Sequence, residues 1–165
     1  MSPTKPTIFS LLLALTYLNP AHSNQESKFS IELNKNQTIS IKNTGRIKNI
    51  KLTHTVSGYE ANCKKTYLMA WGKPERLNIN NPQDSTLTII NLKSKKKPIS
   101  IGFSKNIFDA EFSNDEIHAV IQSDTETTLS IFNGNILTTG ADIKATFKPE
   151  SCDSFEFKSY RKFKE

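Results

Sequence analysis

The stretch of residues 85–103 reads STLTIINLKSKKKPISIGF, two alternating apolar runs separated by a polar, lysine-rich segment. Leu87 and Ile89 alternate with other residues in its first part, and Ile99, Ile101 and Phe103 do the same in its last part. Because side chains two residues apart lie on the same face of a strand, each part predicts a strand with one buried face. The polar, cationic residues between the two parts predict the loop of an antiparallel hairpin.

The same alternation recurs along most of the chain, over residues 29–33, 39–42, 50–56, 129–131, 143–147 and 155–157. Turn signals separate several of these runs, among them Asn43-Thr44-Gly45 and Asn133-Gly134-Asn135, and Asn-Gly pairs are typical of tight hairpins. Short strands about a dozen residues apart predict an all-β fold, an antiparallel β-sandwich with a β-barrel as the alternative. No linker interrupts the pattern, so residues 24–165 are expected to form a single domain.

Two segments fit this pattern less clearly. Residues 59–72, YEANCKKTYLMAWG, are compatible with a long loop, a short helix, or a strand over residues 66–71. In residues 113–122, Ser113 and Glu116 fit a helical capping box, and three apolar residues follow at helical spacing. The β-branched residues of that segment, and the expected strand after it, favour a strand instead.

The N-terminal residues predict a cleavable export signal. Lys5 precedes an uncharged apolar run over residues 8–18, and Asn19-Pro20 then ends any helix. Ala21-His22-Ser23 has small residues at its first and third positions, which signal peptidases accept. A membrane-spanning helix needs about 20 apolar residues, more than this run offers. We therefore expect residues 1–23 to be removed after Ser23, a mature chain without a transmembrane segment, and a secreted or periplasmic location.

The chain contains two cysteines, Cys63 and Cys152. In an oxidising compartment such a pair predicts one disulfide, which would tie the first third of the domain to its C-terminal part. A zinc site would require two further ligands at short spacing, and the sequence has no C-x-x-C motif. We predict neither a metal site nor a cofactor.

The chain has a formal net charge of +6, and its positive charge comes mostly from lysine. Arginine makes the bidentate contacts that read nucleic acids, and the only arginines are Arg46, Arg76 and Arg161. Specific nucleic-acid binding is therefore not expected. Lysines Lys95, Lys96 and Lys97 at the predicted hairpin tip could instead contact an anionic envelope component, a glycan or an acidic protein. Alternatively, they protect a sheet edge from aggregation.

No residue pattern predicts catalysis. His54 and His118 each lie in an apolar alternating run, where a hydrogen-bonded histidine within a sheet is the usual explanation, and the G-x-S-x-G motif is absent. Carboxylates gather at Asp109, Glu111, Asp115 and Glu116, and we interpret them as a solvated edge of the domain.

Three aromatic residues, Tyr59, Tyr67 and Trp71, flank Cys63. Tyrosine and tryptophan are favoured in binding hot spots, but the only tryptophan of a small β-domain is more often part of the core, and the core role is favoured over the binding one. We interpret the chain as an exported non-enzymatic binding protein of the inhibitor, immunity or adhesion type, which recognises a protein or an envelope component. The alternatives are a small secreted hydrolase that uses His54 or His118, and a β-barrel that binds a lipid or small ligand. The oligomeric state is left open.

Overall fold

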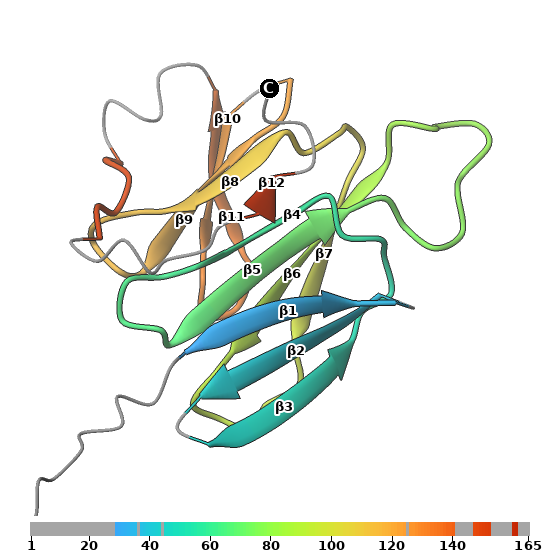
Figure 1. Ribbon diagram of the computed structural model, residues 1–165. Coiled ribbons are helices and arrows are strands. Elements are labelled where there is room, and N and C mark those ends of the chain that lie inside the picture. Colours follow the sequence, from blue (N-terminus) through green and yellow to red (C-terminus); the bar gives the residue numbers. More distant parts are fainter. Residues whose placement is uncertain are drawn as a thin grey trace, which may run out of the picture.

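Three antiparallel β-sheets make up the described part of the chain (Figure 1). The computed structural model describes residues 29–35, 37–43, 45–124, 126–140, 147–152 and 160–161. The predicted signal, residues 1–23, lies outside the described residues, as do the strand expected over 155–157 and most of the one expected over 143–147. The described residues form strands, turns and loops only, which confirms the predicted all-β class.

The sheets are built as follows. The first sheet has the order β1-β2-β3, with the strands Ser30–Asn34, Thr38–Asn43 and Arg46–Lys51. The central sheet has the order β12-β4-β5-β6-β7, with the strands Tyr160–Arg161, Gly58–Ala61, Tyr67–Gly72, Ser85–Asn91 and Ile99–Phe103. The third sheet has the order β11-β10-β9-β8, with the strands Ile136–Gly140, Glu126–Ser130, His118–Gln122 and Asp109–Phe112.

The central sheet is covered on both faces, which gives the molecule three layers (Figure 1). One core lies between the first and central sheets and contains Ile39, Ile41, Ile50, Leu52, Tyr59, Ala61, Leu68, Ala70 and Ile90. The other lies between the central and third sheets and contains Met69, Trp71, Leu87, Ile89, Ile107, Ala110, Phe112, Ala119, Ile121, Leu129 and Ile131. Alternating side chains of β5 and β6 therefore enter different cores.

This double burial explains the ambiguous segment over residues 59–72. A strand buried on both faces has a continuous apolar sequence rather than an alternating one, and β5 reads YLMAWG. Of the three interpretations, the structure selects the strand, preceded by β4 and a turn. The strand favoured within residues 113–122 is also confirmed, since β9 covers His118–Gln122 and a turn precedes it.

The run over residues 50–56 is a partial correction. Strand β3 ends at Lys51, and the alternation beyond it belongs to an irregular segment. That segment lies along the end of β5, because Thr55 N donates to Lys73 O at 2.8 Å and Ser57 N donates to Trp71 O at 2.7 Å. A Cβ on Gly72 would collide with the carbonyl of Thr55, so this close approach requires glycine. Burial therefore alternates here without a regular strand.

The predicted disulfide between Cys63 and Cys152 is present, with 5.3 Å between the two Cα atoms. Cys63 lies in the turn between β4 and β5, whereas Cys152 belongs to the described segment 147–152, which runs beside the end of β8. That segment is hydrogen-bonded to the third sheet through Glu150 N, which donates to Phe112 O at 2.8 Å. The disulfide thus joins the central sheet to the third one, and it is compatible with a location outside the cytosol.

All three sheets are open. None closes on itself within the described residues, so the arrangement is sandwich-like and the alternative of a barrel does not hold.

A helix long and apolar enough to cross a membrane is not found in the described part of the chain.

Candidate functional site

The predicted aromatic residues occupy different environments. Tyr59 is buried in the core between the first and central sheets, and Trp71 is buried in the core between the central and third sheets. Both rings thus have the core placement that was the alternative to binding. Tyr67, at the start of β5, is only partly buried and borders a pocket.

We call this hollow the Tyr67 pocket. It has a volume of about 400 Å³ and lies where the central and third sheets meet, next to the turn that carries Cys63. The pocket is lined by Asn62, Lys64, Thr66, Tyr67, Asn91, Lys93, Asp115, Glu116, Ile117 and Phe132. Four separate turns or strand ends therefore contribute to it.

Part of the pocket is apolar. The rings of Tyr67 and Phe132 meet edge to face, with centroids 6.0 Å apart and an interplanar angle of 79°. Aromatic pairs prefer this geometry. The Phe132 side chain is nevertheless 57% exposed, and Ile117 next to it is 42% exposed. Two large apolar side chains are thus held at the surface.

A network of hydrogen bonds fixes the side of the pocket that carries Tyr67. The buried Asn62 side chain accepts from the backbone N–H groups of Thr66 and Tyr67 through Oδ1, both at 2.8 Å. Its Nδ2 donates to Thr66 Oγ1 at 2.9 Å. Asn62 therefore supplies an acceptor for two backbone N–H groups of this turn and fixes the position of the start of β5.

Charges of both signs surround the apolar part. Lys64 Nζ forms an ion pair with Glu116 Oε2 at 2.5 Å, and Lys93 is exposed. Asp115 accepts from the N–H groups of Ile117 and His118 at 3.0 Å, and its second oxygen contacts His118 Nδ1. Burial acts to raise the pKa of Asp115, but the hydrogen bonds from His118 and the two N–H groups outweigh it and hold the pKa below its usual value.

The two histidines differ. His54 is fully buried, and its nitrogens contact Thr55 O at 2.7 Å and Thr88 Oγ1 at 2.9 Å. Burial lowers the pKa of His54, although the hydrogen bond to Thr55 opposes this shift. His118 contacts Asp115 and the ring of Phe147. Among the described residues, these contacts give His54 a hydroxyl and a backbone carbonyl, and His118 a carboxylate, so neither ring is bonded to both a hydroxyl and a carboxylate as in a catalytic triad.

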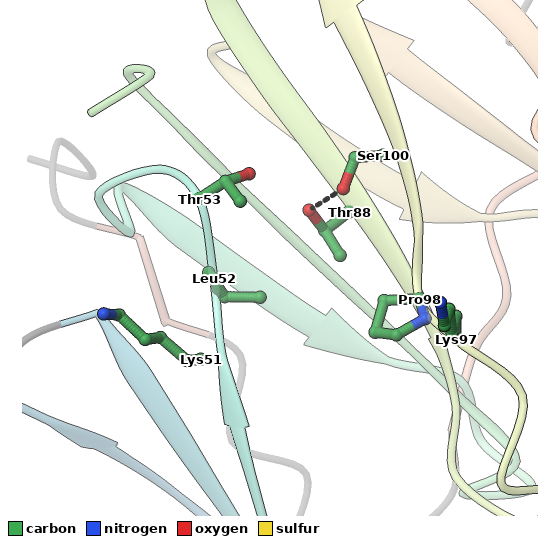
Figure 2. A pocket seen from close by; sticks show the side chains of 7 residues that line it. All are labelled: Lys51, Leu52, Thr53, Thr88, Lys97, Pro98 and Ser100. Atoms are coloured by element: carbon green, nitrogen blue, oxygen red, sulfur yellow. Dashed lines mark hydrogen bonds between the residues drawn. The ribbon is translucent and has the colours of Figure 1, made fainter. Parts of the chain in front are cut away.

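The predicted lysines Lys95, Lys96 and Lys97 are exposed in the loop between β6 and β7. Of these, Lys97 lines a second hollow, which we call the Lys97 pocket (Figure 2). Its volume is about 240 Å³, and it is lined by Lys51, Leu52, Thr53, Thr88, Lys97, Pro98 and Ser100. It lies between the end of β3 and the edge strand β7, and it shares no lining residue with the Tyr67 pocket.

One cluster of the described residues has ligand atoms close enough for a metal ion: Cys63, Glu150 and Cys152, all within 4.8 Å of one another. The two sulfur atoms are bonded to each other and therefore offer no thiolate. Glu150 accepts a hydrogen bond from Cys63 N at 2.9 Å, and burial raises its pKa. The cluster is best described as the surroundings of a disulfide.

Several pocket residues were not expected to act together. Phe132 follows a predicted strand and immediately precedes the Asn133-Gly134 turn signal, where a large apolar residue would be exposed. Asp115 and Glu116 were interpreted as part of a solvated edge, and they do lie at the surface, but as one wall of the Tyr67 pocket. A large apolar residue beside a hairpin turn is the signal that could have revealed this site.

Comparison with known proteins gives no further indication, because no protein-family model matches this chain and no curated protein matches it. Function is therefore inferred from the side chains themselves.

Proposed function

We propose that this chain is an exported, non-enzymatic binding protein that recognises a partner protein through the Tyr67 pocket. The observation that carries the proposal is the half-exposed Phe132, which packs against Tyr67 and lines the pocket together with Ile117 and four charged residues. Protein interfaces have this anatomy, with large apolar side chains at the centre and a polar rim around them.

The charges favour a protein over a small metabolite or a uniformly anionic surface. The lining holds two lysines, Lys64 and Lys93, and two carboxylates, Asp115 and Glu116, and Lys64 is already paired with Glu116. A membrane surface or a polyanion gains little attraction from such a balanced rim, whereas a protein segment can present both signs of charge to it.

The cross-linked, hydrogen-bonded turn beside the pocket also supports binding. Asn62 fixes the start of β5, and Cys63 in the same turn is joined by the disulfide to Cys152 beside the third sheet. A site that is already ordered loses little conformational entropy when a partner docks, so more of the contact energy contributes to affinity.

A capture experiment tests this proposal. The purified protein is immobilised and exposed to secreted and envelope proteins of its source, and retained partners are identified and then purified for affinity measurement. The Phe132→Ala variant should bind the identified partner about 30-fold more weakly, the effect of removing a hot-spot side chain.

The matched control is Phe108→Ala, because Phe108 is 63% exposed and does not line the Tyr67 pocket. It should bind the partner as the unmodified protein does. Equal losses in both variants, or no macromolecule retained by the unmodified protein, would overturn the proposal.

A further inference from the structure

A chain of hydrogen bonds leads from a buried histidine to the surface at the edge of the central sheet. His54 Nε2 is 2.9 Å from Thr88 Oγ1, and Thr88 Oγ1 is 3.0 Å from Ser100 Oγ. His54 is fully buried and Thr88 is 2% exposed, whereas Ser100 is exposed and lines the Lys97 pocket. The Thr88–Ser100 contact is the dashed line in Figure 2.

The protonation of His54 determines which atom donates and which accepts in each of these hydrogen bonds. The carbonyl of Thr55 can only accept, so His54 Nδ1 carries the proton of the contact between them. Because burial lowers the pKa of His54, the ring is neutral and Nε2 is the acceptor. Thr88 therefore donates to His54, and its oxygen accepts the proton of Ser100. Because the Ser100 hydroxyl proton is used in the hydrogen bond to Thr88, Ser100 Oγ can only accept further hydrogen bonds. It therefore suits a ligand group that donates a hydrogen bond.

The remaining walls add two other kinds of contact. Figure 2 shows Leu52 and Pro98 on opposite sides of the pocket, with Lys51 at one margin and Lys97 at the other. The lining contains no carboxylate, and among the described residues neither lysine forms an ion pair. The pocket thus combines a hydrogen-bond acceptor, apolar surface and positive charge.

The acceptor, the apolar surface and the positive charge together restrict the chemical class of ligand that fits the pocket. An anion without a hydroxyl, such as acetate, would use the lysines but could not donate to Ser100, and a neutral sugar would use Ser100 but not the lysines. A sugar ring with an acidic group meets all three, because its C–H face can also pack on Leu52 and Pro98. The volume of about 240 Å³ lies below the roughly 300–1,000 Å³ of pockets for drug-sized ligands, which restricts the ligand to about one ring.

We propose that the Lys97 pocket binds an acidic sugar unit of an anionic polysaccharide. This site is independent of the Tyr67 pocket and of any partner protein bound there. A chain with both sites would be held on an anionic glycan surface while it contacts a protein.

Titrations of the ¹⁵N-labelled protein at low ionic strength test the proposal with three probes: glucuronate, glucose and acetate. Glucuronate should shift the backbone signals of Thr53, Lys97 and Ser100 and bind about tenfold more tightly than glucose or acetate. Acetate equal to glucuronate would mean that only charge matters, and shifts located elsewhere would mean that this pocket is not the site; either result would overturn the proposal.

Two variants separate the contacts. Ser100→Ala removes the acceptor and should weaken glucuronate binding roughly three- to tenfold, the worth of one hydrogen bond. Lys97→Gln should lower the affinity for glucuronate to that for glucose. Both positions are exposed, so the fold should be retained, which the same spectra verify.

The matched control is Lys95→Gln, which removes the same charge from the same loop but lies outside the pocket. It should leave glucuronate binding nearly unchanged, and a loss equal to that of Lys97→Gln would contradict a specific site. Phe132→Ala should also bind glucuronate normally, so a failure of this proposal is distinguishable from a failure of the proposed protein interface.

Discussion

The two interfaces of the central sheet are built from different chemistry. Towards the third sheet, the core contains Trp71 and Phe112, and the Cys63–Cys152 disulfide joins the layers. Towards the first sheet, the core is largely aliphatic, and the polar chain from His54 to Ser100 lies at its edge. The Tyr67 pocket lies at the margin of the cross-linked interface, and the Lys97 pocket lies at the margin of the other. Perturbing one interface should therefore affect mainly one site.

The largest effect is expected from Trp71→Ala. Trp71 is 1% exposed and is among the largest buried side chains, so truncation leaves a cavity in the core next to the third sheet. The free energy of unfolding should fall by about 3–5 kcal/mol, measured by urea denaturation. A loss below about 1 kcal/mol would contradict the described packing.

Its counterpart on the opposite face of β5 is Leu68→Ala, because Leu68 faces the first sheet and is fully buried. We expect a loss of about 2–5 kcal/mol. If the folded Leu68→Ala variant binds glucuronate weakly while Trp71→Ala binds it normally, the two interfaces act separately.

The next effect concerns the disulfide. Replacing both Cys63 and Cys152 by serine should lower the free energy of unfolding by about 2–5 kcal/mol. Hydrogen exchange should become faster in the turn around Asp115 and in the segment that contains Glu150, since these lie beside the cross-link. Treatment of the unmodified protein with a reductant should produce the same changes. If hydrogen exchange became equally faster in the first sheet, the two interfaces would not be separate.

A smaller effect is expected from Gly58→Ala. A Cβ at Gly58 would collide with the indole ring of Trp71, which lies directly opposite on β5. Overpacking of this kind costs about 1–3 kcal/mol. In a Trp71→Leu background the same substitution should cost clearly less, which a double-mutant cycle measures. Additive losses would show that the ring does not occupy that space.

The smallest effect is a pH dependence at the interface with the first sheet. Burial lowers the pKa of His54 below its ordinary value of 6.5, so between the two values the unfolded chain binds a proton that the folded chain excludes. The free energy of unfolding should therefore decrease as the pH falls through 6.5, with no contribution from His54 above that value. The His54→Gln variant should lack this slope between neutral pH and the onset of carboxylate protonation, and an identical slope would exclude His54 as its origin.

The alternation of apolar residues predicted much of this architecture, including β1, β2, β6, β7 and β10 and the turns before β3 and β11. It did not decide between strand, helix and loop for β5, because burial on both faces removes the alternation that marks a strand. It extended the run after Ile50 too far, since Leu52 and His54 are buried by an irregular segment held to the end of β5. The alternation of apolar residues in the sequence indicates which side chains are buried. It indicates a strand only where one face of that strand is exposed to solvent.

The binding sites were less accessible to sequence reasoning. Tyr67 and Lys97, which the sequence suggested as binding residues because of the nearby cysteine and the lysine run, each border a pocket, and their role in binding stays a prediction. Phe132 and Asp115 reach the Tyr67 pocket from turns distant in the chain. Such proximity depends on how the sheets stack, which a single sequence does not encode in its spacing.

The double burial of β5 also bears on how this strand finds its correct pairing. In an ordinary half-buried strand, a slip of one residue exposes the apolar side chains, and this penalty fixes the register. In β5 a slip would only exchange Leu68 and Ala70 for Met69 and Trp71, all of them apolar. Shape therefore helps to select the register, because a Cβ at Gly58 would collide with the indole of Trp71, its partner across the pair. A residue without a side chain thus contributes specificity to the pairing of β4 with β5.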